Sequence, residues 1–163
     1  MEVAKLKENR PRAVLALCLG NICRSPIAEE LLREHCSVKG LELIIDSAGT
    51  SAYHSGEAPD RRSVKVMSQH GHDISEQRSR PLSQLDFKRF DLILAMDQTN
   101  LKNARQLCKD KEDESKVQLF LRDGRDVPDP YYGGVNGFER VYQMIERSAI
   151  EWAAIWAQLE VGN

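Results

Sequence analysis

The stretch VLALCLGNICRSPIAEELL, residues 14–32, decides the fold of this chain. Its first half is a continuous apolar run that ends at Cys18, as expected for a buried strand. Its second half begins with Ser25 as helix N-cap and Pro26 at the first helical position, and Gly40 follows the last helical residue. The stretch therefore predicts a strand, a compact loop and a helix in immediate succession.

The same alternation of apolar runs and helical patterns continues along the chain. The predicted strands are residues 13–17, 41–46, 90–96 and 116–120, and the predicted helices are residues 25–40, 59–71, a segment after Asp97, and 138–159. This order predicts an α/β fold with a small doubly wound parallel sheet of four strands, flanked by helices on both faces. We expect one domain over residues 1–163, with a core of about 13–159, and a solvated loop at the charged run 109–116.

The composition is that of a soluble globular protein. With 23 basic and 25 acidic residues the net charge is -2, which argues against a nucleic-acid binder. No apolar stretch is long enough for a membrane span, and the first residues, MEVAKLKENRPR, lack the apolar core of a signal peptide. The four cysteines do not resemble a disulfide framework, so we expect a reduced, cytoplasmic protein.

Cys18 lies where ligands bind in open α/β sheets, at the carboxyl end of a strand. The loop from Cys18 to Ser25 wraps the positive end of the following helix, and its backbone N–H groups can bind an anion. Arg24 adds a planar guanidinium that can hold two oxygens of a phosphate. The same features favour the thiolate of Cys18 over the thiol. The loop is not a Walker loop, because it lacks the Gly-Lys-Ser/Thr ending.

The loop sequence CLGNICRSPIAEELL closely resembles the active-site loop of low-molecular-weight protein tyrosine phosphatases, and the chain looks like a bacterial-type member. The resemblance extends from about Ala13 to the last helix. It includes DSAGT (46–50), FDLILAMDQTNL (90–101) and, most specifically, DPYYGG (129–134). It implies a metal-independent enzyme without cofactors that hydrolyses phosphotyrosine and small aryl phosphates through a cysteinyl-phosphate.

The resemblance also implies roles for individual residues. Cys18 would be the nucleophile, Arg24 the phosphate clamp and Asp129 the general acid, which the stiff Pro128 and Pro130 flank. Ser25 would donate a hydrogen bond to the sulfur of Cys18. The residues expected to bind phosphate or support the loop are Leu19, Gly20, Asn21, Ile22, Cys23, Ser25 and Ser47. Asn21 suits a left-handed backbone position in such a loop.

By the same resemblance, aromatic side chains wall the substrate pocket. Its expected lining is Leu19, Tyr53, His54, Tyr131 and Tyr132. Flat rings suit a phenyl group, because they bury area with a defined geometry. Many bacterial relatives carry tryptophan at the position of Tyr53, which leaves the detailed substrate preference open. The expected partner is a protein that contains phosphotyrosine, with a bacterial tyrosine kinase as one candidate.

Several alternatives remain open at this point. A related phosphoarginine phosphatase branch carries threonine in place of Ile22, so Ile22 favours phosphotyrosine. An arsenate reductase would need a downstream pair of relay cysteines, whereas Cys36 and Cys108 are far apart in the sequence. A non-catalytic phosphate-binding module would need neither a thiolate nor an acid. Cys23 is either a buried filler or a redox partner that protects oxidised Cys18 through a disulfide.

One further motif, His70-Gly71-His72, invites a metal-site interpretation. His70 fits the end of a predicted helix, however, and Gly71 fits its C-cap. No further cluster of ligands accompanies the pair, so we expect no metal site.

Overall fold

The computed structural model describes residues 9–131, 133 and 136–161. A four-stranded parallel sheet in the order β3-β2-β4-β5 lies at its centre. The strands are β2 (Ala13–Cys18), β3 (Ile44–Gly49), β4 (Leu92–Ala95) and β5 (Val117–Leu119). The order reverses beside β2, which is the topological switch point of a doubly wound sheet.

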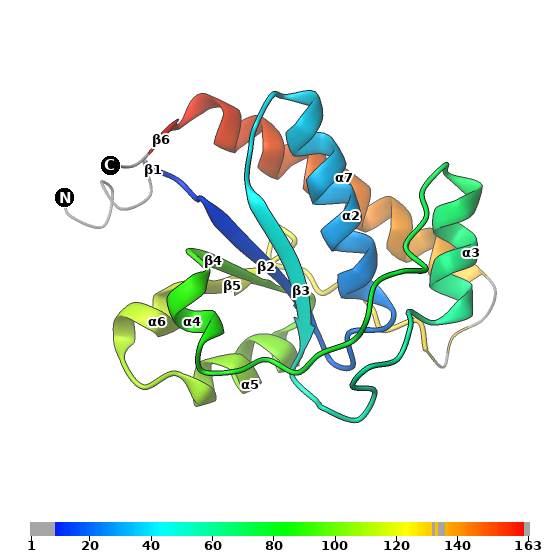
Figure 1. Cartoon of the computed structure of the whole chain (residues 1–163), viewed down its shortest axis with the longest axis horizontal. Coiled ribbons are helices and arrows are strands. Elements are labelled where there is room, and N and C mark those ends of the chain that lie inside the picture. The colour runs from blue at the N-terminus through cyan, green and yellow to red at the C-terminus, as the bar shows by residue number, and fades with distance from the viewer. Residues whose placement is uncertain (1–8, 132, 134–135, 162–163) are drawn as a thin grey trace.

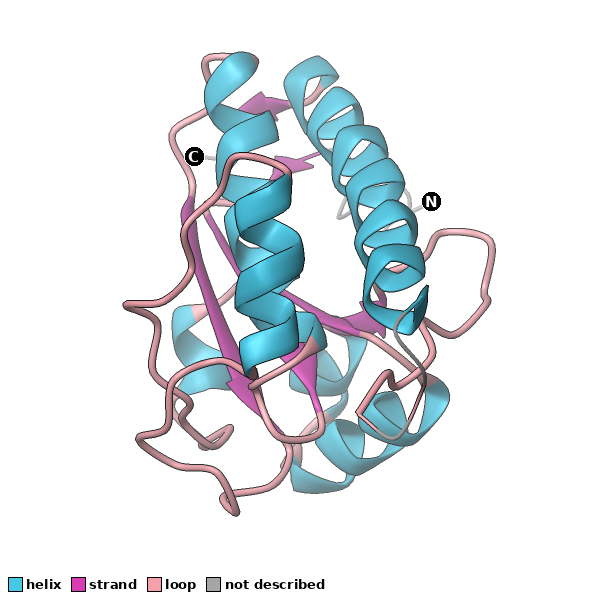
Figure 2. Ribbon diagram, turned by 90° about the vertical axis from the view of Figure 1, so that its right-hand side faces the viewer, coloured by secondary structure: helices cyan, strands magenta, loops and turns pink. Residues whose placement is uncertain are grey.

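Helices cover both faces of this sheet, as the sequence predicts (Figures 1 and 2). On one face α2 (Arg24–Val38) packs against α7 (Asn136–Gln158), and α3 (Arg61–Gln69) contacts both. On the other face lie α4 (Asp86–Arg89), α5 (Gln98–Leu107) and α6 (Lys111–Ser115). The parallel sheet is therefore buried between two layers, which explains why its strands are continuous apolar runs.

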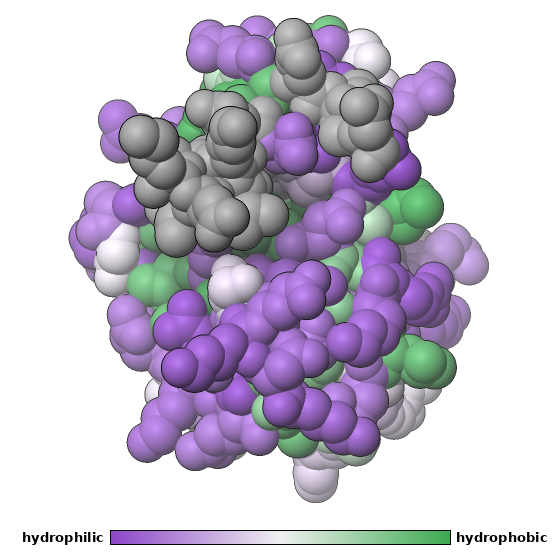
Figure 3. All heavy atoms as spheres, turned by 90° about the vertical axis from the view of Figure 1, so that its left-hand side faces the viewer, coloured by the Kyte–Doolittle hydropathy of each residue, from purple (hydrophilic) through white to green (hydrophobic). Residues whose placement is uncertain are grey.

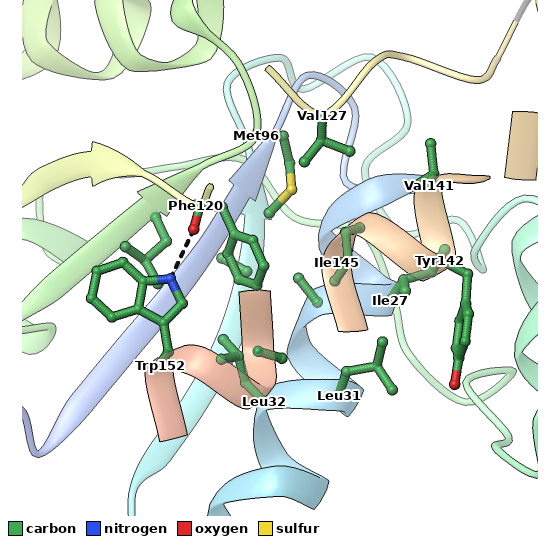
Figure 4. Close-up of a cluster of buried hydrophobic side chains, with 14 of the residues drawn as sticks. Ile27, Leu31, Leu32, Met96, Phe120, Val127, Val141, Tyr142, Ile145 and Trp152 are labelled. Carbon is green, nitrogen blue, oxygen red and sulfur yellow. Dashed lines mark hydrogen bonds between the residues drawn. The ribbon is translucent and has the colours of Figure 1, made fainter. Parts of the chain in front are cut away.

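The larger hydrophobic core lies between the sheet and the pair α2 and α7 (Figure 4). Side chains from both helices, from the ends of β4 and β5 and from the segment after β5 meet there: Ile27, Leu31, Leu32, Met96, Phe120, Val127, Val141, Ile145 and Trp152. The indole N–H of Trp152 donates to the carbonyl oxygen of Phe120 at 2.8 Å, so its one polar group is paired inside the core. This packing fixes the start of α2 against the end of the sheet.

The bounds of β3 follow from strand pairing and differ from those that the apolar pattern predicts. We predicted a strand over 41–46, but β3 begins at Ile44, because Ile44 is the residue that pairs with Ala13 at the start of β2. Leu41 and Leu43 instead pack into the core before the strand begins. β3 continues to Gly49, which pairs with Cys18. The two strands therefore end together at the edge of the sheet where Cys18 lies.

Two local predictions were wrong. The first helix begins at Arg24 with Cys23 as N-cap, so Ser25 is not the N-cap and Pro26 is not at the first helical position. The charged run 109–116 is not only a loop, since it contains the short helix α6, capped by Asp110. Asp113 in that helix is buried and pairs with Lys88 at 3.1 Å. The side of the molecule on which α4 and α6 lie is largely hydrophilic (Figure 3).

A second, two-stranded sheet was not predicted. β1 (Asn9–Arg10) pairs in parallel with β6 (Glu160–Val161), and the Arg10 side chain donates to the carbonyl oxygen of Trp156 at 2.8 Å. This contact ties the two ends of the described chain together (Figure 1).

Within the described residues, none of the helices has the length and apolarity needed to cross a membrane.

Candidate active site

The segment from Cys18 to Arg24 forms a tight loop between β2 and α2. The Cys18 side chain is buried, and its Sγ lies 3.1 Å from the hydroxyl of Ser25. The backbone N–H of Asn21 donates to the same sulfur at 3.3 Å. Two polar groups, the backbone N–H of Asn21 and the hydroxyl of Ser25, therefore contact the sulfur directly.

Asn21 shapes the loop. It has a left-handed backbone with φ 56°, the conformation that asparagine tolerates better than most residues. Its side-chain amide donates to Ser25 Oγ at 2.7 Å and to Ser47 Oγ at 2.9 Å, and its Oδ1 accepts the backbone N–H of Arg80 at 3.1 Å. One side chain thus links the loop to α2, to β3 and to the segment after α3.

The network continues into a buried carboxylate that the sequence analysis did not identify. Ser47 donates to Glu29 Oε1 at 2.7 Å, and Arg33 donates to Glu29 Oε2 at 3.0 Å. Burial raises the pKa of the Glu29 carboxyl, although the hydrogen bonds from Ser47 and Arg33 oppose the shift. Glu29 lies about one turn into α2, where the sequence pattern predicts a surface residue of an amphipathic helix. No local signal in the sequence therefore distinguishes it from an exposed glutamate.

Neighbouring segments hold the loop from outside. A Cβ at Gly49 would lie 2.7 Å from the carbonyl oxygen of Leu19, so β3 can approach the loop only because residue 49 is glycine. Ser79 Oγ donates to the carbonyl oxygen of Gly20 at 2.9 Å, and the N–H of Asp60 donates to that of Ile22 at 2.8 Å. These contacts fix the direction of the loop's own N–H groups.

Arg24 is almost fully buried and is held by two acceptors. Its Nη1 donates to Asp97 Oδ2 at 2.6 Å and to the carbonyl oxygen of Val127 at 2.9 Å. Burial alone lowers the pKa of the Arg24 guanidinium, but the charges of Cys18 and Asp97 outweigh it and raise that pKa. Asp97 was missed as a site residue, although its place directly after a predicted strand is a usable signal.

The structure brings Asp129 to the same point. Its Oδ2 lies 3.7 Å from Arg24 Nη2, although the two residues are more than a hundred positions apart. Its Oδ1 accepts the backbone N–H of Tyr131 at 3.0 Å, and the N–H of Gly133 donates to the carbonyl oxygen of Pro130 at 3.0 Å. The carboxyl is 39 % exposed, so it faces the mouth of the site rather than the core.

The residues expected to line the pocket mouth come from three separate segments. Leu19 is 47 % exposed and Tyr53 is 86 % exposed, which is unusual for large apolar side chains. The ring of His54 meets Tyr53 edge-on at 4.8 Å and lies 6.3 Å from Tyr131. Tyr132 lies outside the described residues. The exposed Leu19 and Tyr53 and the partly buried His54 and Tyr131 are therefore the described residues of the expected pocket rim.

The other cysteines differ from Cys18. Cys23 is buried at the N-cap of α2, where burial and the charge of Asp60 raise the pKa of its thiol. Cys36 lies in the larger core, and burial raises the pKa of its thiol to about 11. Cys108 packs against the smaller core on the opposite face of the sheet. All four cysteines are free. Cys36 and Cys108 lie on opposite faces of the sheet, so these two cysteines do not form a relay pair.

The two histidines of the His-Gly-His motif make ordinary structural contacts. His70 ends α3, stacks on Tyr142 with ring centroids 3.8 Å apart, and hydrogen-bonds Glu139 at 2.9 Å. His72 Nε2 lies 3.1 Å from a carboxylate oxygen of Glu34. Among the residues that the structure describes, no three His, Cys, Asp or Glu side chains are grouped to hold a metal ion.

Comparison with known proteins agrees with this geometry. Residues 13–161 match the family model of low molecular weight phosphotyrosine protein phosphatase. The low molecular weight phosphotyrosine protein phosphatase of Schizosaccharomyces pombe is 43% identical over 144 residues, covering 83% of this chain and 91% of the relative.

Solved structures show the same fold. A protein tyrosine phosphatase from Entamoeba histolytica superimposes with a TM-score of 0.80 and 38% identity, over 85% of this chain and 92% of that one. Vibrio vulnificus Wzb in complex with benzylphosphonate gives a TM-score of 0.80 at 28% identity, over 88% and 97%. This chain belongs to the low molecular weight phosphotyrosine protein phosphatase family.

Proposed function

We propose that this protein is a phosphotyrosine phosphatase in which Cys18, Arg24 and Asp129 carry out the chemistry. The observation that carries the proposal is their convergence. The sulfur of Cys18 contacts the hydroxyl of Ser25 and accepts the N–H of Asn21, and Arg24, the residue before Ser25, lies 3.7 Å from Asp129. A nucleophile, an oxyanion clamp and an acid are the groups that a phosphate ester requires.

In the first step, the thiolate of Cys18 attacks phosphorus. The N–H groups of the loop and the guanidinium of Arg24 hold the non-bridging oxygens, whose charge they balance. As the ester bond breaks, protonated Asp129 gives its proton to the leaving phenolic oxygen, whose reference pKa of about 10 makes it a poor leaving group without a proton. The products of this step are tyrosine and a cysteinyl-phosphate.

In the second step, the Asp129 carboxylate takes a proton from a water molecule that attacks the cysteinyl-phosphate. The S–P bond breaks, inorganic phosphate leaves, and Cys18 returns to a thiolate. Ser25, whose hydroxyl lies 3.1 Å from the sulfur, stabilises that departing thiolate. The residues of this chain supply every group that the two steps use, so no metal or cofactor is invoked.

The substrate class follows from the pocket mouth. The neighbouring rings of Tyr53, His54 and Tyr131 suit a planar phenyl ring, and Wzb, which is similar to this chain, binds benzylphosphonate. Small aryl phosphates and phosphotyrosine proteins are the proposed substrates, with a bacterial tyrosine kinase as a candidate among the latter. Apolar Ile22 in the loop disfavours the phosphoarginine alternative.

The remaining proposals concern the cell and redox chemistry. We propose that the protein is cytoplasmic, since its four thiols are unpaired. We also propose that residues 1–163 form one domain. We also propose that Cys23 forms a reversible disulfide with Cys18 once peroxide has oxidised Cys18. Because the pKa of the Cys23 thiol is raised, this closure should be slow and should accelerate with rising pH. Equal recovery of Cys23→Ser and wild type in reductant would contradict the protective role.

One experiment tests the central proposal. Hydrolysis of p-nitrophenyl phosphate is compared in wild type, Cys18→Ser and Asp129→Ala, with a panel of phosphotyrosine, phosphoserine and phosphoarginine peptides alongside. Cys18→Ser should lose all turnover, while Asp129→Ala should lose about 10²- to 10⁴-fold. In contrast to wild type, Asp129→Ala should show no decline of activity at alkaline pH. Turnover by Cys18→Ser, or a preference for phosphoarginine, would overturn the proposal, and arsenate-dependent thioredoxin oxidation would favour the reductase.

A further inference from the structure

The turn that carries Asp129 is packed against the first turn of α3 through one arginine. The guanidinium carbon of Arg62 lies 5.5 Å from the centre of the Tyr131 ring and 4.6 Å from that of Phe138. Tyr131 belongs to the Asp129 turn, since its backbone N–H donates to Asp129 Oδ1 at 3.0 Å. Phe138 is buried in the first part of α7. Arg62 therefore touches both the acid turn and the helix that follows it.

The carboxylate of Asp60 holds the same guanidinium in place. Its Nε donates to Asp60 Oδ1 at 3.0 Å and its Nη2 to Asp60 Oδ2 at 2.9 Å, a two-point contact that fixes the plane of the group. Asp60 in turn donates its backbone N–H to the carbonyl oxygen of Ile22 at 2.8 Å. Ser63, one residue after Arg62, donates its hydroxyl to the carbonyl oxygen of Cys23 at 3.0 Å. The first turn of α3 is thus fastened directly to the phosphate loop.

Together these contacts close a ring around the mouth of the site. It runs from Ile22 through Asp60 and Arg62 to Tyr131 and Asp129, and it returns to the loop at Arg24, 3.7 Å from Asp129. We propose that Arg62 is a positioning residue, which sets the distance between the acid of Asp129 and the phosphate held by the loop. This inference rests on the proposed function and names no group that touches the substrate.

A role confined to the stability of α3 does not account for these contacts. Asp60 already caps the helix by accepting the backbone N–H of Arg62 at 2.8 Å, which any residue at position 62 would supply. The side-chain pair between Arg62 and Asp60 is also 45 % exposed on the arginine side, where ion pairs add little stability. What the guanidinium adds is its contact with the rings of Tyr131 and Phe138, which a lysine ammonium does not fully reproduce.

The test separates proton donation from stability. The value of kcat/KM is measured for a series of aryl phosphates, from phenyl phosphate, whose leaving group needs a proton, to dinitrophenyl phosphate, whose leaving group does not. The variants are Arg62→Met and Arg62→Lys, and the matched control is Arg61→Met, an exposed arginine on the same helical turn. Thermal unfolding of each variant shows whether it is folded at the assay temperature.

We expect Arg62→Met to lose roughly 3- to 30-fold in kcat/KM on phenyl phosphate, which is the range of a cation–π contact expressed as a rate. Dinitrophenyl phosphate should be hydrolysed within about twofold of wild type, since Asp129 contributes little to that leaving group. Arg62→Lys should fall between wild type and Arg62→Met, and Arg61→Met should match wild type on every substrate. A steeper dependence on the leaving group in the Arg62 variants alone supports the inference.

Several results would overturn it. They are an equal loss on all substrates, no loss in Arg62→Met, or the same loss in Arg61→Met. If Arg62→Met does not fold, Tyr131→Leu tests the same contact from the other side, and an unchanged leaving-group dependence there overturns the inference. Where both variants fold, the double variant should show no steeper dependence of kcat/KM on the leaving group than Tyr131→Leu alone. Additive effects of the two substitutions on this dependence would count against the inference. If wild type hydrolysed no aryl phosphate, or if Cys18→Ser hydrolysed it as well as wild type, the proposed function itself would be refuted. The failure of the proposed function is therefore distinguishable from the failure of this inference.

Discussion

Replacing Gly49 by alanine tests whether the fit between β3 and the loop from Cys18 to Arg24 controls the proposed catalysis. The added Cβ would lie 2.7 Å from the carbonyl oxygen of Leu19 and 3.0 Å from the backbone nitrogen of Asn21. Gly49 is not among the residues with a left-handed backbone, so the lack of space is the whole effect. The atoms in the way belong to the backbone, which cannot rotate aside as a side chain can.

The size of the effect follows from how little either side can move. The Leu19 oxygen would have to retreat by about 0.7 Å to reach the 3.4 Å of ordinary contact. It is held by the N–H of Ser51 at 2.9 Å, and Gly49 is held on both sides, by Arg80 at 2.9 Å and Leu82 at 2.7 Å. Overpacking of this kind costs about 1–3 kcal/mol of stability. A loop displaced by most of an ångström should lose on the order of 10- to 100-fold in kcat/KM.

The assay is p-nitrophenyl phosphate hydrolysis together with urea unfolding, for Gly49→Ala and for Gly137→Ala as a control. A Cβ at Gly137 would meet only the Cβ of Pro130 at 3.7 Å, and the residue is inside α7, where alanine is favoured over glycine. The control should therefore keep its activity and gain slight stability. A Gly49→Ala enzyme within about twofold of wild type in kcat/KM would refute the reasoning.

Three further predictions concern buried charges and the ends of the chain. Asp97→Asn should keep the cap of α5 but lower the free energy of unfolding by about 2 kcal/mol in urea titrations, because Arg24 loses its charged partner; no loss would contradict this. Folding raises the pKa of Glu29 above 4.5, so the protein should lose stability relative to Glu29→Gln as the pH rises from about 4.5; a difference independent of pH would refute that. Arg10→Met should lower the unfolding midpoint through loss of its bond to Trp156, worth about 1 kcal/mol, and an unchanged midpoint would argue against the pairing of β1 and β6.

The sequence predicts the layered architecture well, because buried parallel strands appear as short apolar runs. It predicts the bounds of strands less well, as β3 shows. There the pairing of Ile44 with Ala13 decides where the strand begins, while Leu41 and Leu43 are apolar for a different reason, the core beside α2. Ser25 shows the same limit at a helix start. It has the composition of an N-cap, but its hydroxyl is engaged with Cys18 and Asn21.

The candidate site divides in a similar way. Cys18, Arg24 and Asp129 can be found from motifs, because each lies in a short segment with distinctive neighbours. Glu29 cannot be found in this way, and Asp97 only by its place directly after a predicted strand, since what makes both part of the site is a partner supplied by the topology. β4 lies beside β2 only after a crossover, and that crossover is what brings the carboxylate at its end to Arg24.

The contacts of Arg24 affect how its kinetic contribution can be measured. Its Nη1 donates to the carbonyl oxygen of Val127, only two residues before Asp129, with the stiff Pro128 between them. Removing Arg24 therefore releases the segment that leads to Asp129, the proposed acid, and also removes the proposed clamp on phosphate. The rate losses of Arg24→Ala and Asp129→Ala should overlap, so that the double variant is less impaired than their product. The loss seen in Arg24→Ala alone is then an upper bound on what its charge contributes to holding phosphate.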